Sequence, residues 1–205
     1  GLGDVYKRQE YISYWERLIY MKDSPLGVPN EIPLAIMSEK LKKKITVVLS
    51  GEGADELMGG YGKIFRSPFD FENHNNSKNK FYDYFIQKYE YVPREIRNEF
   101  LNSSFKYRYE FDEINSECFR TCKKEESIFR FFHKYHVKGL LQRVDMTTMQ
   151  TSVEARVPFL DHKLIEFSYQ NIPYELKLKW NSENALINAK KTNAESYSEV
   201  LDTPK

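Results

Sequence analysis

Residues 45–61 have the sequence ITVVLSGEGADELMGGY, which contains the clearest indication of the fold class. Its first part, residues 45–49, is a short run rich in β-branched side chains, which is typical of a fully buried strand in a parallel sheet. Glycines follow where the backbone has to turn, and Ala54 then begins a segment with a helical start. The order of strand, tight loop and helix predicts an α/β domain.

Helical patterns on both sides of this stretch predict that helices dominate the domain. Before the strand, residues 11–21 have apolar side chains at helical spacing, and Asn30 is placed to cap a second helix. After it, residues 126–155 carry a long helical pattern, and Asp161 is placed to cap a helix that runs to Tyr169.

The composition is that of an ordinary globular protein. Hydrophobic residues make up 40% and charged residues 30% of the chain, and no apolar run approaches the roughly 18 residues of a membrane span. The formal net charge is +1, so the chain as a whole has no electrostatic attraction to nucleic acid or anionic lipid. The 15 Tyr and 14 Phe residues are therefore interpreted as helix-packing side chains rather than as base-stacking ones.

Cysteine usage indicates a reducing, cytoplasmic compartment. Cys118 and Cys122 are too few for a disulfide framework, and their i,i+4 spacing places them on one helix face. A zinc finger that also uses His133 and His136 is rejected, because the stretch between the second cysteine and the first histidine is too short.

The first nine residues, GLGDVYKRQ, carry no signal for secretion, because no apolar segment follows a basic start. We interpret residues 1–9 as a non-native adaptor tail, and we expect the native protein to begin upstream. Residues 10–205 are then the part of the chain to which fold reasoning applies.

The loop after the strand concentrates groups that could bind a nucleotide. Ligands of open α/β sheets gather at the carboxyl ends of strands, which is where the hydroxyl of Ser50 and the carboxylates of Glu52, Asp55 and Glu56 stand. Such carboxylates suit a metal ion or a proton, and the glycines allow a ligand close to the backbone. The loop is neither a Walker A loop nor a dinucleotide fingerprint. From these residues alone, a plain turn with an acidic helix start is an equally good interpretation.

Two segments resemble the C-terminal synthetase domain of the asparagine synthetase family. Residues 50–61, SGEGADELMGGY, closely resemble the family signature SGEGADELFGGY, with Met58 at the usual aromatic position. Residues 140–167, LLQRVDMTTMQTSVEARVPFLDHKLIEF, resemble the family's run of Arg, Asp, Met, Ser, Glu and Arg followed by PFLD. The resemblance implies a helix-dominated α/β fragment of an adenine nucleotide alpha-hydrolase-like domain, the ATP-pyrophosphatase fold.

The resemblance also implies ATP-dependent amide synthesis with magnesium. In similar enzymes aspartate is adenylated on its side-chain carboxylate, pyrophosphate leaves, and ammonia then attacks the activated acyl group. The ammonia comes from glutamine in an N-terminal glutaminase domain that has no counterpart here, and the full-length protein could be a homodimer. The family's phosphate loop, SGGxDS, is also missing from this sequence, so we expect the 205-residue chain alone to be inactive.

Site residues follow from the resemblance position by position. Four residues match the family's ATP-binding segment: Ser50, Gly51, Glu52 and Gly53. Glu52 also matches the catalytic glutamate that is tied to forming and using the adenylate, and Asp55 matches the aspartate that holds magnesium and pyrophosphate. Lys205 could be the family's catalytic lysine, which contacts phosphate and stabilises developing charge.

The second segment supplies charged residues with less defined roles. Four of them are candidates for contact with the substrate: Arg143, Asp145, Glu154 and Arg156. Arg156 and Asp161 flank an apolar turn, so an ion pair that fixes this loop is an alternative role for Arg156.

Two other functions stay open at this stage. Similar domains amidate or cyclise other carboxylates, including β-lactam precursors and sugar acids, and the residues that select the substrate extend beyond this chain. The other alternative is a non-catalytic scaffold of the same fold, which the upstream reading frame would distinguish.

Overall fold

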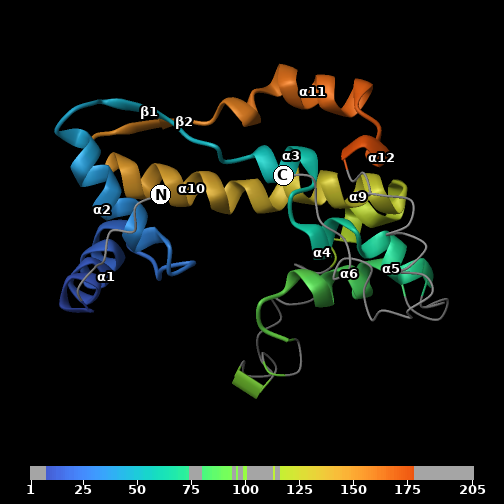
Figure 1. Ribbon diagram of the computed structural model, residues 1–205. Helices are drawn as coiled ribbons and strands as arrows, with labels where there is room; N and C mark the ends of the chain where they lie inside the picture. The colour runs from blue at the N-terminus through green and yellow to red at the C-terminus, as the bar shows by residue number, and fades with distance from the viewer. Residues whose placement is uncertain are drawn as a thin grey trace. The chain divides into compact units, whose positions relative to one another are not determined.

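The computed structural model describes residues 8–73, 80–93, 96, 99–100, 113 and 116–177. Helices dominate this part of the chain, and its strands form one two-stranded parallel sheet (Figure 1). The helix-dominated α/β prediction is therefore confirmed. The chain divides into two compact units: unit 1 is residues 1–52 and 137–159, and unit 2 is residues 53–136 and 160–205. Among the described residues, no helix has the length and apolar character needed to cross a membrane.

Unit 1 combines three helices with the sheet. Its described elements are α1 (Arg8–Lys22), α2 (Glu31–Lys42), β1 (Val47–Leu49), α10 (Val137–Met149) and β2 (Glu154–Arg156). Leu18 of α1 packs against Ile32, Ala35 and Ile36 of α2, and all four side chains are buried. The boundary expected after Gln9 stays a prediction, and α1 itself begins at Arg8.

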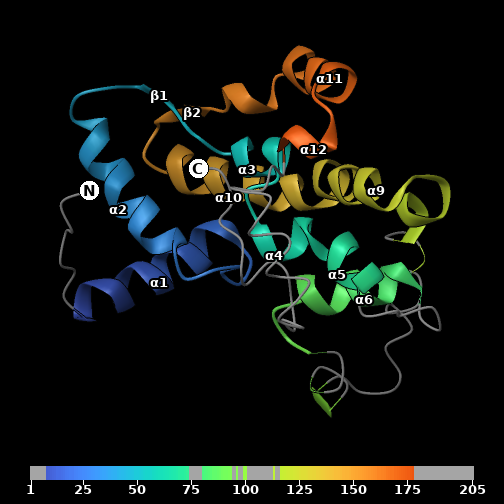
Figure 2. The same cartoon turned by 45° about the vertical axis from the view of Figure 1, so that its right-hand side comes forward.

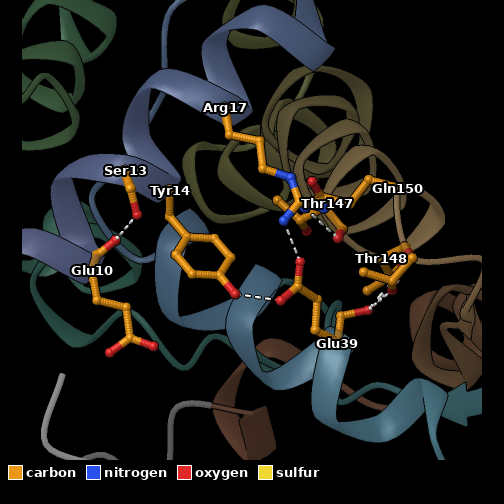
Figure 3. Close-up of polar contacts among 10 residues, drawn as sticks. Glu10, Ser13, Tyr14, Arg17, Glu39, Thr147, Thr148 and Gln150 are labelled. Carbon is orange, nitrogen blue, oxygen red and sulfur yellow. Dashed lines mark hydrogen bonds and ion pairs between the residues drawn. The ribbon is translucent and has the colours of Figure 1, made fainter.

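Polar contacts complete the packing of unit 1. In Figure 3, Glu39 of α2 accepts hydrogen bonds from Tyr14 and from Arg17 of α1, the latter with an N–O distance of 2.5 Å. The buried Ser38 hydroxyl lies 2.6 Å from the hydroxyl of Thr151, just beyond the end of α10. These contacts hold α2 between α1 and α10, and α10 in turn packs on β2.

The sheet pairs β1 with β2 in parallel, with Leu49 opposite Arg156. The prediction of a fully buried strand at residues 45–49 is wrong for the described structure: the strand covers Val47–Leu49, and Leu49 is 70% exposed. The physical reason is that β1 has one partner strand among the described residues, and a sheet of two strands leaves most of its surface uncovered.

The long helix predicted for residues 126–155 is confirmed in its first part and wrong at its end. Helical structure runs from Lys124 through a π-helical turn into α10, which ends at Met149. A turn with Ser152 at φ 56° follows, and the amides of Thr151 and Ser152 bond to the last turn of α10. Residues 154–156 then form β2, because they find the backbone of β1 as a partner.

Unit 2 is built from short helices around an aromatic core. Its described elements are α3 (Ala54–Met58), α4 (Gly62–Phe65), α5 (Ser67–Asn73), α6 (Phe81–Tyr89), α9 (Lys124–Phe131), the π-helical turn (Phe132–His136), α11 (His162–Asn171) and α12 (Tyr174–Lys177). A 3-10 helix, Pro158–Leu160, spans the boundary between the units in the sequence. Figure 2 shows α5 and α6 side by side, as in the first view.

The core of unit 2 confirms the packing role expected of the aromatic residues that it contains. Phe65 and Phe129 have ring centroids 4.6 Å apart, and Phe85 and Phe131 lie 5.0 Å apart, with all four side chains buried. Tilted and edge-on pairs of this kind add to the energy of burying the rings. The rings of these residues therefore pack the core of unit 2.

The two predicted helix caps differ. Asp161 caps α11, since its Oδ1 accepts from the amides of Lys163 at 2.9 Å and Leu164 at 3.3 Å. Asn30 precedes α2 as expected, but its side chain makes no capping hydrogen bond. Its backbone is already helical, with φ −74° and ψ −4°, whereas a capping side chain usually requires an extended backbone.

Candidate functional site

The segment of residues 50–61 is called the motif below, with residues 50–52 as its first half and residues 53–61 as its second half. The first half leaves the sheet of unit 1 at the carboxyl ends of its strands. The amide of Ser50 donates to the carbonyl oxygen of Arg156 at 2.8 Å, which extends the ladder between β1 and β2 by one bond. The Ser50 hydroxyl then accepts from the amide of Glu52 at 3.4 Å. Because both strands point the same way, their ends form the edge where α/β sheets bind ligands.

Glu52 meets Arg143 at this edge. Nη2 of Arg143, on α10, donates to Oε1 of Glu52 at 2.6 Å, and the side chains are 16% and 24% exposed. Nε of Arg143 is buried and has no hydrogen-bond partner within the described residues. A charge-assisted bond of this length fixes the orientation of the carboxylate. The structure thus brings together two predicted site residues that lie 91 positions apart.

Gly51 borders open space. A Cβ atom built on Gly51 would meet nothing within 4 Å, and the residue is exposed. Packing among the described residues therefore gives no reason for a glycine at this position. Room beside the backbone is what the close approach of a ligand would require.

Within the described residues, the side chains of the other three candidates of unit 1 make no hydrogen bond or ion pair with Glu52 or Arg143. Nε of Arg156 donates to Oε1 of Glu154 at 2.8 Å, and both side chains are more than half exposed on one face of β2. Asp145 is exposed on α10 and lines a hollow of about 360 Å³ with side chains of α10 and of the β2 region. Their role as substrate contacts stays a prediction.

The second half of the motif begins unit 2, and packing explains its glycines. Gly53 has φ +95°, and a Cβ there would lie 2.4 Å from the side chain of Leu160. Gly59 ends α3 in the left-handed region with φ 76°. A Cβ on Gly60 would lie 2.1 Å from Oδ1 of Asp55. Each of these glycines is needed either for its backbone angle or for the space beside it.

Asp55 stands in the first turn of α3 with its carboxylate over Gly60. The residue is exposed, and no hydrogen bond or ion pair of its side chain occurs within the described part of unit 2. Within the described residues, no group of three or more His, Cys, Asp or Glu side chains is arranged to hold a metal. Magnesium in nucleotide sites is usually held by one or two carboxylates together with phosphate oxygens, so a single free Asp55 carboxylate fits that ion.

Glu56 has a different role from the one expected of a loop carboxylate. It is only 1% exposed, its Oε1 accepts from the hydroxyl of Tyr61 at 2.6 Å, and His136 Nε2 lies 3.6 Å away. The hydroxyl of Tyr89 is 2.9 Å from the other ring nitrogen of His136, and burial raises the pKa of Tyr89 to about 12. The expectation that Glu56 serves a metal or a substrate proton is therefore wrong, because its carboxylate is committed to this buried network.

The remaining predicted residues either have local structural roles or lie outside the residues that the structure describes. Asp161 caps α11 in unit 2, whereas Arg156 belongs to unit 1, so an ion pair between them stays a prediction. Cys118 and Cys122 are free thiols, and Cys118 is buried. Lys205 lies outside the described residues.

Comparison with known proteins gives one consistent family. The family model described as Asparagine synthase matches residues 5–189. Glutamine-hydrolyzing asparagine synthetase 1 of Bacillus subtilis (strain 168) is 28% identical over 91% of this chain and 34% of its own length. Asparagine synthetase 3 of the same organism is 27% identical over 89% of this chain and 30% of its own length. The chain thus spans about a third of these relatives. No solved structure matches it significantly.

Proposed function

This chain belongs to the asparagine synthase family, and on that premise we propose that it forms the synthetase part of a ligase that makes asparagine from aspartate, ATP and ammonia. The family domain has the ATP-pyrophosphatase fold. The observation that carries the proposal is the bond between Glu52 and Arg143 at the carboxyl ends of parallel strands. It joins the two motif segments at the edge of the sheet where a nucleotide is expected.

The proposed reaction has two stages. The side-chain carboxylate of aspartate attacks the α-phosphorus of ATP, and pyrophosphate leaves to give an acyl-adenylate. Ammonia then attacks the acyl carbon, and AMP leaves. The acyl-adenylate is a good acyl donor because AMP is a much better leaving group than hydroxide.

Residues 50–53 are proposed to contact ATP, with the open side of Gly51 as the point of closest approach. Glu52 is proposed to act both in forming the acyl-adenylate, as one of the residues that contact ATP, and in using it. In the second stage it accepts a proton as ammonia adds, because a carboxylate positioned near the reacting nitrogen can act as a general base. Arg143 holds that carboxylate in place through the 2.6 Å bond. Asp145, Glu154 and Arg156 are proposed to contact the substrate, and Lys205 to stabilise the charge that develops on phosphate.

Asp55 is the proposed ligand of magnesium. When bound, the ion would neutralise negative charge on the phosphates and so help pyrophosphate to leave. The support for this assignment is the exposure of the Asp55 carboxylate and its lack of a partner among the described residues.

An isotope experiment on the full-length protein tests the proposal. Aspartate with ¹⁸O in its side-chain carboxylate is supplied with ATP, magnesium and ammonia, and the products are analysed by mass spectrometry. We expect asparagine together with AMP that carries one ¹⁸O atom, because adenylation transfers a carboxylate oxygen to AMP. Labelled AMP from another carboxylate, but not from aspartate, would instead support the related amidotransferases. Folded protein that makes no AMP from any carboxylate would support a non-catalytic scaffold.

Ammonia is proposed to come from glutamine, hydrolysed by a separate domain of the full-length protein, and the reaction is assigned to the cytoplasm. The relatives are named as glutamine-hydrolyzing enzymes, which supports the ammonia source. Replacing ammonia by glutamine in the same assay tests this part. Asparagine formation that requires added ammonia, with no response to glutamine, would contradict it.

A further inference from the structure

Lys177, at the end of α12 in unit 2, is a largely buried residue whose side chain has no acidic partner within the described part of the chain. Its residue is 8% exposed, and its Nζ lies 4.5 Å from the ring centroid of Phe129 and 5.2 Å from that of Tyr169. The Lys177 ammonium group makes no hydrogen bond or ion pair within the described residues. Lysines are rarely buried to this degree unless a carboxylate pairs with them. The interaction with the two ring faces offsets only part of the cost of burying the charge.

Lys177 also lines a hollow of about 500 Å³. This volume lies within the usual range for small-molecule sites. The wall is mixed: charged side chains line it together with Phe129 and four other aromatic or apolar residues, Tyr169, Ile172, Pro173 and Tyr174. The hollow therefore gives a small molecule a route to an amine that the rest of the fold shields.

The other polar groups of the hollow are either engaged in hydrogen bonds or carry charges of both signs. The hydroxyl of Tyr174 donates to the carbonyl oxygen of Phe65 at 2.5 Å, and the hydroxyl of Tyr169 lies 3.0 Å from Nδ1 of His133. Glu126 pairs with Arg130 at 2.6 Å, and Glu125 and Lys123 line the same wall. The two acids balance the two lysines of the wall, so the hollow favours neither anions nor cations and suits a neutral molecule that reacts with the amine.

The amine is also chemically prepared to react. Burial lowers the pKa of Lys177 to about 8, so a sizeable fraction is neutral near pH 8, and a desolvated neutral amine is a nucleophile. Burial likewise lowers the pKa of the neighbouring His133, which leaves that imidazole uncharged at the same pH. Lys134 is the opposite case: it is exposed, and its 2.6 Å bond to Glu117 raises its pKa.

We propose that Lys177 is an acylation site that accepts small acyl groups from neutral thioesters entering the aromatic hollow. The amine nitrogen attacks the thioester carbonyl carbon, a C–N bond forms and the C–S bond breaks. The leaving thiolate takes the proton that the amine loses, so the products are an amide and a thiol. The amide is neutral, so the reaction removes a positive charge that has no ion-pair partner among the described residues, while the aliphatic stem stays packed.

Site-resolved acetylation of the full-length protein tests this proposal. The probe is S-acetyl-N-acetylcysteamine, a small neutral thioester, and peptide mass spectrometry measures the rate at each lysine from pH 6.5 to pH 10. At pH 8 we expect Lys177 to react on the order of ten times faster than Lys134, because far more of its amine is neutral. The rate at Lys177 should level off above its pKa, while the rates at exposed lysines continue to rise.

Two controls separate the folded site from general lysine chemistry. Lys124 also lies over a ring, 5.2 Å from the centroid of Phe71, but it is paired with Glu72 and is exposed, so it should react as slowly as Lys134. In urea the preference for Lys177 should disappear. Acetylation of Lys177 no faster than that of Lys134 at pH 8, or an equal preference in the unfolded chain, would overturn the proposal.

Discussion

The two halves of the motif at residues 50–61 are built on different principles. In residues 53–60 the glycines and the buried Glu56 are explained by backbone angles, close packing and an internal hydrogen-bond network. In residues 50–52 the glycine borders open space, and the glutamate bonds a distant arginine at the end of a sheet. The needs of folding therefore explain most of the residues in the second half but few of those in the first. Chemistry is therefore to be sought first at Ser50, Gly51 and Glu52.

The largest effect is expected from Glu52→Gln in the full-length protein. The amide keeps the shape of the side chain but cannot accept a proton, so asparagine formation should fall at least about 100-fold. The melting temperature should change little, because the amide oxygen of glutamine can still accept the hydrogen bond from Arg143. Glu117→Gln, which alters an exposed ion pair in unit 2, is the matched control and should keep full activity. Unchanged turnover in Glu52→Gln would remove Glu52 from the mechanism.

A pair of glycine substitutions should separate the halves by stability. Gly53→Ala places a Cβ against Leu160 at a positive φ, and we expect a loss of about 2–4 kcal/mol in the free energy of unfolding. Gly51→Ala adds a methyl group to open space and should change stability by less than about 0.5 kcal/mol. Urea unfolding measures both. In Gly51→Ala the apparent KM for ATP should rise instead. Equal losses of stability in the two variants would contradict the proposed difference between the two halves.

Tyr61→Phe examines the buried network of the second half. It removes the hydroxyl that donates to Glu56 at 2.6 Å, and a buried carboxylate that loses a donor should cost about 1–3 kcal/mol of stability. Thermal and urea unfolding give this value. The kcat of the remaining folded enzyme should stay within about twofold of the unmodified protein. A large fall in kcat at unchanged stability would show that the Glu56 network takes part in the chemistry directly.

Asp55→Asn is expected to have the smallest effect on the fold. It tests a residue of the second half to which a chemical role is assigned. The carboxylate is exposed and without a partner among the described residues, so unfolding should be unaffected. The magnesium concentration needed for half-maximal activity should rise about tenfold, equivalent to about 1.4 kcal/mol, because an amide is a weaker ligand for a hard cation. A magnesium dependence equal to that of the unmodified protein would remove Asp55 from the metal site.

Local patterns predicted the local structure well. The β-branched run gave a strand, Gly53 preceded a helix, and Asp161 formed the cap that its position suggested. These features depend on neighbours within a few residues, which a sequence pattern records directly. The resemblance to a known family supplied the candidate residues of the first half.

Contacts between distant segments could not be derived in the same way. The sequence EAR at residues 154–156 has no strand signal of its own, and it forms β2 because the backbone of β1 lies beside it. The burial of Glu56 depends on Tyr61 and on His136, which comes from a different helix. The exposure of Leu49 follows from the number of strands beside it rather than from its own hydrophobicity.

The central claim is that Glu52 and Arg143 act together in forming the acyl-adenylate. The most direct measurement is aspartate-dependent exchange of labelled pyrophosphate into ATP by the full-length protein, in a double-mutant cycle of Glu52→Gln and Arg143→Met. We predict that each single variant loses at least about tenfold of the exchange rate and that the double variant is no slower than the worse single one, because the pair works as a unit. Independent, multiplying losses, or exchange at the unmodified rate in Glu52→Gln, would contradict the account.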